Sequence, residues 1–231
     1  TAGEIPVPVE VRHDPLGPAK SGSVLGREIF VHRFEGVSPQ KVLVVGGIHG
    51  DETQSVLFAE TLVDSLGALE PGSLANTVLV VPLLNPDGYE LGTRQNAAGV
   101  DLNRNFPSLD FRVGEPGDRY YGGEAAASEP ETLFMMELIQ REKPDLLVML
   151  HTPYSLVESD GDSLGLGPQL ARELGLAYQE EMNYPTPGSI GSYYGKERGL
   201  VVITLELPPR DDVWALHGEG FMRFLAALGL K

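Results

Sequence analysis

Side chains suited to metal binding and proton transfer lie beside apolar segments at several places in this sequence. His49 and Glu52 are three residues apart and follow the apolar run 42–45. Glycines at positions 46, 47 and 50 allow the chain to turn sharply after this run. His151 follows a mostly apolar segment, and Glu206 stands inside another. Two histidines and one glutamate, with a fourth position left for water, are the ligands of many catalytic zinc sites. We therefore interpret His49, Glu52 and His151 as three ligands of one zinc ion.

Glu206 is the candidate for a general base beside this metal. Burying an unpaired carboxylate costs several kcal/mol, so its place in an apolar segment calls for a metal ion, an arginine or a proton nearby. Zinc lowers the pKa of a bound water from about 16 toward about 7 and polarises a scissile carbonyl. Glu206 would take the water proton and return it to the leaving amine. The alternatives are that His151 is a core histidine and that Glu206 forms a structural salt bridge.

These residues are expected at the carboxyl ends of buried strands in an α/β fold. The expected strands are 41–45, 77–84, 145–150 and 200–205, with an edge strand at 27–34. The expected helices are 52–66, 128–143, 168–174, 189–198 and one from 211 or 212 onward. Alternating strands and helices predict a single domain over residues 1–231, a three-layer α/β/α architecture with a mostly parallel mixed central sheet. Ligands of such sheets bind outside the carboxyl ends of the strands.

Local signals mark the connections between these elements. Residues 85–88 have the composition of a turn, and the loop 89–123 is long enough to suggest a functional role. Ser128 and Glu131 have the spacing of a capping box. The last helix is expected to bury Leu216, Phe221, Phe224, Leu225 and Leu228.

The composition excludes several classes of partner and ligand. The formal net charge is −16 and the pI is about 4.6, and an acidic surface repels nucleic acid and anionic membranes. No apolar run is long enough to span a bilayer, and no stretch resembles a signal peptide. Cysteine is absent, so disulfides and thiolate ligands are excluded. We therefore expect neither a nucleic acid nor a membrane partner.

Ordered motifs between residues 46 and 208 resemble the M14 zinc carboxypeptidase family. The matching segments are 46–52, 85–88, 94, 99–106, 121–122, 128–131, 150–152, 188–190 and 204–206. The resemblance implies a carboxypeptidase-like fold, one zinc ion per chain, and hydrolysis of a small peptide that has a free C-terminal carboxylate.

The resemblance also implies roles for residues of the long loop. Arg94 corresponds to the residue that polarises the scissile carbonyl and stabilises the oxyanion. Asn103 and Arg104 correspond to the anchor for the terminal carboxylate, which a planar guanidinium binds through two parallel hydrogen bonds. Asp101 corresponds to the carboxylate that orients His49.

Further residues that the resemblance assigns to the substrate lie between 184 and 194. Tyr184 falls near the family's mobile substrate-capping tyrosine, with Tyr193 and Tyr194 as competitors. Ile190 stands where digestive members of the family set side-chain preference, and an acidic residue there favours basic substrates. An isoleucine therefore argues against an enzyme specific for basic C-terminal residues.

Within the family, the chain is most similar to the compact bacterial subgroup of murein peptide amidases, notably in segments 99–107 and 184–189. These enzymes cleave the γ-D-glutamyl–meso-diaminopimelate bond of cell-wall peptides, and a role in wall-peptide recycling implies a cytoplasmic location. Diaminopimelate carries an extra amino acid head group, so its pocket should contain a polar partner. The candidates are Arg112, Arg119 and Lys196, each of which is also explained as a solvated surface charge.

Three rival functions use the same residues. The first is an N-acyl amino acid deacylase of the aspartoacylase or succinylglutamate desuccinylase type, which would share His49, Glu52, His151 and Glu206. The second is a general compact carboxypeptidase. The third is a non-catalytic zinc-binding module, which would be expected to lack its general base, whereas Glu206 is present.

Overall fold

A seven-stranded mixed sheet forms the centre of the structure, a computed structural model that describes residues 22–230. The strands are β1 (His32–Phe34), β2 (Lys41–Val45), β3 (Thr77–Val81), β4 (Leu146–His151), β5 (Leu156–Asp160), β6 (Ala177–Gln179) and β7 (Val201–Glu206). Their order is β1-β3-β2-β4-β7-β5-β6. Strands β3, β2, β4 and β7 are parallel, whereas β1 and β5 pair antiparallel with β3 and β7.

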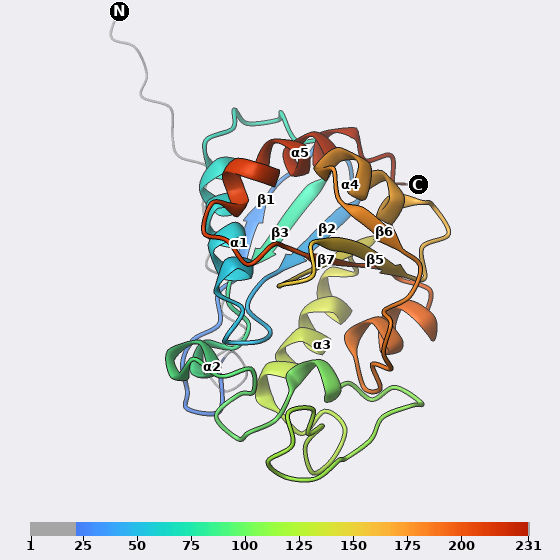
Figure 1. The fold of residues 1–231 in the computed structure, drawn as a ribbon. Helices are drawn as coiled ribbons and strands as arrows, with labels where there is room; N and C mark the ends of the chain where they lie inside the picture. Colours follow the sequence, from blue (N-terminus) through green and yellow to red (C-terminus); the bar gives the residue numbers. More distant parts are fainter. Residues whose placement is uncertain (1–21, 231) are drawn as a thin grey trace, which may run out of the picture.

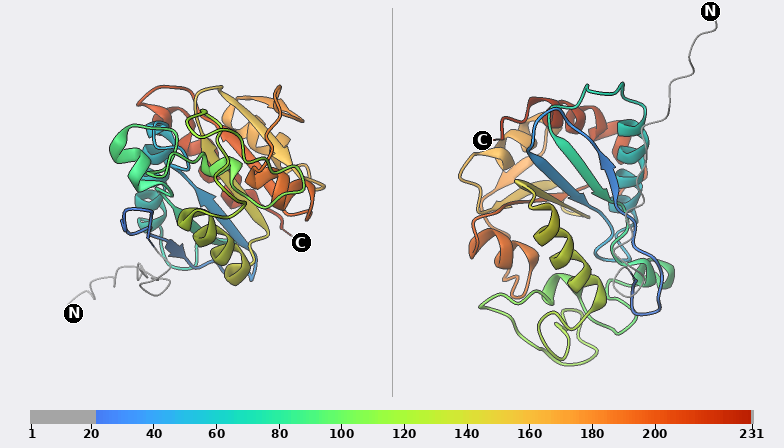
Figure 2. Two further views of the ribbon diagram at one scale, coloured as in Figure 1. Left: turned by 90° about the horizontal axis from the view of Figure 1, so that it is seen from below. Right: turned by 180° about the vertical axis from the view of Figure 1, so that it is seen from behind.

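Helices cover both faces of this sheet (Figures 1 and 2). They are α1 (Thr53–Gly67), α2 (Pro86–Leu91), α3 (Pro130–Glu142), α4 (Leu166–Leu174) and α5 (Val213–Ala227), with a 3-10 turn η1 (Leu102–Arg104) and a π-helical segment η2 (Gly191–Lys196). Helices α1, α4 and α5 pack on one face, and α3 and η2 pack on the other. These are the three layers expected from the sequence. No helix within residues 22–230 combines the length and the apolar character needed to cross a membrane.

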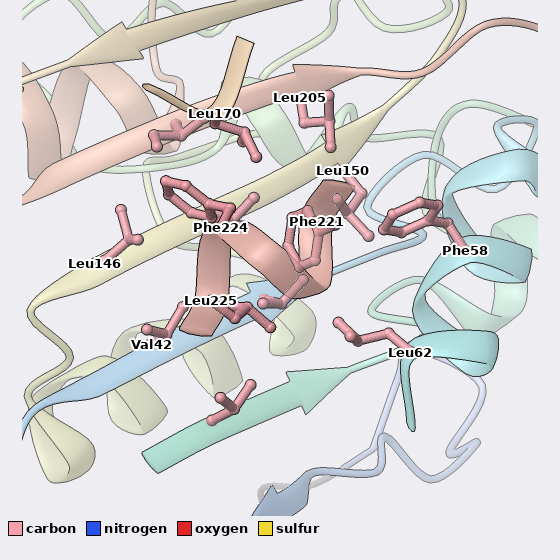
Figure 3. Close-up of a cluster of buried hydrophobic side chains, with 14 of the residues drawn as sticks. Val42, Phe58, Leu62, Leu146, Leu150, Leu170, Leu205, Phe221, Phe224 and Leu225 are labelled. Carbon is pink, nitrogen blue, oxygen red and sulfur yellow. The ribbon is translucent and has the colours of Figure 1, made fainter. Parts of the chain in front are cut away.

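The larger hydrophobic core lies between the sheet and the helices α1, α4 and α5 (Figure 3). Phe221 and Phe224 of α5 are fully buried. The ring of Phe58 of α1 packs edge-on against that of Phe221, with 5.4 Å between the ring centres. Strand residues such as Val42 and Leu150 face this core. The residues that alternate with them along each strand face α3, because successive side chains of a strand point to opposite faces. Burial of each large apolar side chain stabilises the fold by about 1.5–3 kcal/mol. Because a shift of one residue would move every side chain of a strand to the opposite face, packing on both faces fixes the strand register.

The ends of β2 and β4 form the crevice at which the chain reverses its path across the sheet. Helix α1 leads from β2 to β3 on one side, and α3 leads from β3 back to β4 on the other. Because α1 and α3 cover opposite faces, the loops after β2 and β4 separate there, as at ligand sites of other open α/β sheets. His49 follows β2, and His151 at the end of β4 pairs directly with Glu206 at the end of β7.

Several element bounds differ from the sequence expectations. The sequence prediction missed β5 and β6, because polar Glu158 and Asp160 interrupt the apolar pattern of β5 and β6 is only three residues long. The edge strand expected at 27–34 is confined to β1. The turn expected at 85–88 is instead the start of α2, where the Asn85 side chain accepts a hydrogen bond from the Gly88 backbone N–H.

The predicted capping box and one predicted core residue are wrong. Ser128 Oγ donates to Glu129 Oε1 at 2.6 Å, and Glu131 Oε1 accepts from the backbone N–H of Val24 at 3.1 Å. Ser128 thus bonds to the side chain of Glu129, which occupies the N-cap position, and Glu131 bonds to a distant segment, so α3 begins without a side-chain cap. Leu216 is half exposed, whereas the other four apolar residues named for the last helix are buried.

Gly50 is expected to be essential for stability because it lies in the turn that carries His49. A Cβ at this position would overlap the backbone of Gly88 and Tyr89, which cannot move away as a flexible side chain would. Gly50→Ala should therefore lower the free energy of unfolding by about 1–3 kcal/mol, the usual cost of overpacking, measured by urea denaturation. The control Gly67→Ala meets its first neighbour only at 3.9 Å. Equal stability of the two variants would contradict this prediction.

Candidate metal centre

The structure gathers His49, Glu52 and His151 in the crevice at the ends of β2 and β4. One candidate ligand atom from each lies within 4.8 Å of the others, and all three residues are buried. Glu52 occupies the N-cap position of α1 and faces both histidines. Its Oε1 is 2.7 Å from His49 Nδ1, and its Oε2 is 2.9 Å from His151 Nδ1.

Asp101 fixes the orientation of His49. The ionised carboxylate of Asp101 can only accept, so His49 Nε2 carries a proton and donates it to Asp101 Oδ1 at 3.1 Å. Asp101 is held in turn by Arg94 Nε at 2.9 Å and by the Asn103 backbone N–H at 3.0 Å. The other ring nitrogen, His49 Nδ1, lies 2.7 Å from Glu52 Oε1 and 3.2 Å from Arg94 Nη1. His49 Nδ1 is therefore the atom that faces Glu52.

This donor set fits a zinc ion. The Nδ1 atoms of His49 and His151 face the carboxylate of Glu52 at 2.7 Å and 2.9 Å, so a cation bound among these three residues would have two imidazole nitrogens and a carboxylate as ligands. Burial raises the pKa of Glu52, but His49 and His151 outweigh burial and hold it well below its usual range. The carboxylate thus stays ionised. Two imidazoles and a carboxylate without thiolates are the donors of a catalytic zinc site, and the Asp101 contact is the outer hydrogen bond that such a histidine needs.

Glu206 lies beside this cluster at the end of β7. It is 4% exposed, and its Oε2 accepts a hydrogen bond from the Tyr154 backbone N–H at 3.3 Å. Burial raises its pKa above that of an ordinary glutamate, while His151 opposes this shift. Within the part of the chain that the structure describes, Glu206 forms no salt bridge. The alternative of a structural salt bridge therefore has no support among residues 22–230.

Two arginines that line the same cavity both lie close to the ring of the exposed Tyr120. The guanidinium groups of Arg94 and Arg104 lie 5.4 Å and 5.2 Å from the ring centre of Tyr120. Arg94 is neutralised by Asp101, but Arg104 is 5% exposed and donates to the carbonyl oxygen of Asn103 rather than to a carboxylate. Burial lowers the pKa of Arg104, although Asp101 opposes this. A buried cation without a carboxylate contact is suited to binding an anionic ligand.

Asn103 and Ile190 connect the arginine side of the cavity to η2. Asn103 Oδ1 accepts a hydrogen bond from the backbone N–H of Ile190 at 3.1 Å. Ile190 is 2% exposed, packs with the α3-side core and lines the cavity. Gly188 has a φ of +71° and lies against the backbone of Arg104, where a Cβ would overlap. The segment 188–190 therefore packs directly against Asn103 and Arg104.

Tyr184 lies at the cavity, and its two competitors do not. Tyr184 is 39% exposed, and its ring centre is 6.4 Å from that of Tyr154. Burial raises the pKa of Tyr184 to about 12, so its phenol can donate a hydrogen bond at neutral pH. Tyr193 and Tyr194 instead pack against Phe106 in the core.

Sequence reasoning named Lys196 as a candidate but missed the two carboxylates beside it at the far end of the cavity. The cavity has a volume of about 440 Å³ and is also lined by Glu158, Asp160 and Lys196. Both carboxylates lie on β5, whose residues pair antiparallel with those of β7. Lys196 Nζ is 3.4 Å from Asp160 Oδ1. Glu158 and Asp160 are two residues apart, which places both on the same face of a strand. This spacing could have indicated the cluster only if β5 had been recognised as a strand.

The three cations considered for the substrate head group are placed differently. Lys196 and Arg119 line the cavity, and Arg112 does not. The side chain of Lys196 is half exposed, and the guanidinium of Arg119 lies 5.9 Å from the ring centre of Tyr120.

Glu158 is expected to make the folded state less stable as the pH rises. Burial and the neighbouring Asp160 raise its pKa from 4.5 to about 8, against the opposing effects of Thr204 and Lys196. The folded protein therefore binds this proton more tightly than the unfolded chain. The resulting stabilisation is complete below pH 4.5 and is lost as the pH rises through about 8, at up to about 1.4 kcal/mol per pH unit.

Urea denaturation at several pH values across this window measures the effect. Glu158→Gln should remove most of the decline, whereas Glu219→Gln, which alters an exposed carboxylate, should leave it unchanged. An identical decline in Glu158→Gln and in the unaltered protein would contradict the prediction.

Comparison with known proteins gives matches over most of the chain. Residues 21–162 match the family model described as zinc carboxypeptidase. The chain is 36% identical to murein peptide amidase A of Escherichia coli (strain K12) over 198 residues, which is 81% of this chain and 79% of that protein. It is 34% identical to murein peptide amidase A of Vibrio campbellii over 218 residues, which is 88% of this chain and 84% of that protein.

A solved structure supports the same relationship. The crystal structure of murein-tripeptide amidase from Escherichia coli O157 matches this fold with a TM-score of 0.79 at 31% sequence identity. The match covers 92% of each chain. The carboxypeptidase-like α/β/α fold expected from the sequence is therefore confirmed.

Proposed function

This chain belongs to the zinc carboxypeptidase family of peptide hydrolases, and from that premise we propose that it cleaves the γ-D-glutamyl–meso-diaminopimelate bond of murein peptides. The observation that carries the proposal is the meeting of the His-Glu-His cluster with Glu206 and Arg104 in one cavity. The curated relatives in Escherichia coli and Vibrio campbellii are both murein peptide amidases, and each similarity spans most of both chains.

His49, Glu52 and His151 would hold one zinc ion. Zinc bound there would act as a Lewis acid on the scissile carbonyl and would make a bound water more acidic. Asp101 keeps His49 Nδ1 available as a ligand, because it accepts the proton that His49 carries on Nε2.

Glu206 would serve as the general base and then as the general acid. Its raised pKa, caused by burial, makes the carboxylate a better proton acceptor than an exposed glutamate. In this role Glu206 accepts a proton from the attacking water and delivers it to the leaving amine nitrogen. The Tyr154 backbone N–H holds Glu206 Oε2 and so orients the carboxylate.

The arginine side of the cavity would bind and orient the substrate. Arg104, with Asn103, would bind the free carboxylate of the leaving residue, since Arg104 is buried without a carboxylate partner. Arg94 would donate to the carbonyl oxygen as negative charge develops on it. Tyr184 would cover the bound peptide, and Ile190 would contact the side chain of the leaving residue.

Assays on the zinc-loaded protein test this function. The substrates are L-alanyl-γ-D-glutamyl-meso-diaminopimelate, its lysine analogue, a C-terminal hydrophobic dipeptide and an N-acyl amino acid, each with and without chelator. Chelator-sensitive release of diaminopimelate is the expected result. Turnover of the hydrophobic dipeptide alone would indicate a general compact carboxypeptidase, and turnover of the N-acyl amino acid alone would indicate a deacylase.

Arg104→Gln is expected to weaken recognition of the free terminal carboxylate. A charge-assisted hydrogen bond contributes about 1.5–3 kcal/mol, so kcat/KM should fall by about 10–100-fold, mainly through KM. An analogue with an amidated C-terminus should be a poor substrate for both proteins, because it lacks the anion. Arg112→Gln removes the same charge outside the cavity and serves as the control. If Arg104→Gln still preferred the free acid as strongly as the unaltered protein, Arg104 would not be the anchor.

A further inference from the structure

The far end of the cavity is formed by one face of β5 and by the π-helical segment η2. Residues directly opposite on paired strands point to the same face, and Glu158 lies opposite Thr204 while position 156 lies opposite Glu206. Glu158 and Asp160 therefore face the same cavity as the proposed general base. Each two-residue step along a strand advances about 6.7 Å, so Glu158 and Asp160 lie about 7 Å and about 13 Å along β5 from the position of Glu206.

Two glycines of η2 make room for Asp160. A Cβ on Gly191 or on Gly195 would overlap atoms of the Asp160 side chain. The next residue, Lys196, ends η2 and places its ammonium 3.4 Å from Asp160 Oδ1. Segments of π-helix are rare and frequently occur at functional sites. Here the segment positions a carboxylate and an ammonium next to each other at the cavity wall.

Carboxyl groups outnumber cations among the residues that line this end of the cavity. Glu158 and Asp160 are both 8% exposed or less, and only one ammonium, that of Lys196, is within salt-bridge distance of either within the described residues. Glu181 also lines the cavity and repels the negative charge of Asp160. Burial and Asp160 raise the pKa of Glu158 to about 8, so Glu158 keeps its proton near neutral pH, and an ammonium group bound beside it would favour its ionised form.

We propose that Glu158, Asp160 and Lys196 form a recognition site for a zwitterionic amino acid head group at the end of the leaving residue's side chain. The two carboxylates bind the ammonium group of the ligand, and the ammonium of Lys196 binds its carboxylate. This inference rests on the proposed function, because it assigns the far end of the cavity to the side chain of the residue that is released.

The dimensions and charges favour this head group over simpler ones. In meso-diaminopimelate the second amino acid centre lies four C–C bonds from the first, about 5 Å in an extended chain. Its polar atoms extend further and reach the depth of Glu158. A side chain that carries only an ammonium would be repelled by Lys196, and one that carries only a carboxylate would be repelled by Glu158 and Asp160.

Three tripeptides separate the two halves of the head group. The three L-alanyl-γ-D-glutamyl peptides differ in their last residue. The side chain of meso-diaminopimelate carries both an ammonium and a carboxylate, that of lysine carries the ammonium alone, and that of 2-aminopimelate carries the carboxylate alone. The zinc-loaded protein is expected to prefer the first by at least about 10-fold in kcat/KM over each of the others, since a site built for two polar groups rejects analogues that lack one. Equal kcat/KM for the three peptides would overturn the inference.

Matched variants assign each charge to its partner. Lys196→Met should lower kcat/KM for the diaminopimelate peptide by at least about 10-fold and leave the lysine peptide nearly unchanged. Asp160→Asn and Glu158→Gln should lower turnover of both of these peptides but not of the aminopimelate peptide. Arg112→Met controls for net charge. Equal losses on all substrates would mean a structural role and would overturn the inference.

Equilibrium binding separates this inference from the proposed function. Calorimetry with free meso-diaminopimelate and free lysine reports the head-group site without any turnover. If no tripeptide is cleaved but diaminopimelate binds at least about 10-fold more tightly than lysine, and Lys196→Met abolishes that preference, the head-group site stands and the proposed reaction fails. If the tripeptide is cleaved but the two amino acids bind equally, the reaction stands and the head-group site fails.

Discussion

Glu206→Gln is expected to retain the metal and to lose turnover by about 10²–10⁴-fold in kcat, the range for removal of a general base. Glutamine has the size and shape of glutamate, so it can keep the hydrogen bond from the Tyr154 backbone N–H. It cannot accept the proton of the attacking water. The metal should remain because the ligand cluster is His49, Glu52 and His151, and Glu206 lies outside it.

Two measurements are required, zinc content and single-turnover kinetics on the diaminopimelate tripeptide. Glu219→Gln provides the matched control, because it makes the same chemical change at a glutamate side chain that is 91% exposed. The control should have full zinc content and full activity. Nearly full activity in Glu206→Gln would show that the proton is moved by another group and would refute the mechanism proposed here.

The sequence was sufficient to predict the parts of the site that follow long apolar strands. His49, His151 and Glu206 each stand out because a polar residue directly follows or ends an apolar run. Once the strands are parallel, their carboxyl ends lie together, and the register that pairs His151 with Glu206 is set by the apolar pattern. The packing of both sheet faces, visible in Figure 3 for one of them, enforces this arrangement.

The roles in the long loop came from family motifs and not from periodicity. Asp101 and Arg104 lie in a loop with little regular structure, so no local pattern predicts that Asp101 contacts His49 across 52 residues. Such contacts depend on the path of the loop over the sheet. The predicted capping box at Ser128 and Glu131 failed for a partly related reason, since Glu131 bonds to Val24 far away in the sequence while Ser128 bonds to its neighbour Glu129.

The far end of the cavity could not be predicted because its residues look like surface residues in the sequence. Glu158 and Asp160 give β5 a polar appearance, although both are buried. Lys196 was considered as a partner of the substrate and equally as a solvated charge, and its position beside Asp160 depends on the π-helical geometry of η2. The proposed head-group site therefore lies in the elements with the weakest sequence patterns.

His151→Ala is expected to weaken zinc binding by more than the factor of about 10–100 that is typical for loss of an outer hydrogen-bond partner. The variant removes one of the three donors that converge on the site, and alanine offers no replacement. Activity should fall with zinc content. The measurement is zinc affinity by competition with a chromogenic chelator, followed by metal analysis after dialysis.

Thermal unfolding gives an independent readout that requires no activity. A ligand at about 1,000 times its Kd stabilises the folded state by about 4 kcal/mol, so zinc should raise the Tm of the unaltered protein and have little effect on His151→Ala. Asp101→Asn should show an intermediate loss of affinity, because Asp101 contacts His49 Nε2 without facing the site. His217→Ala is the matched control, since the His217 ring bonds to the Leu174 carbonyl and does not line the cavity. Unchanged zinc affinity in His151→Ala would remove His151 from the ligand set and leave the site with only His49 and Glu52, too few protein donors for the three that a catalytic zinc normally has.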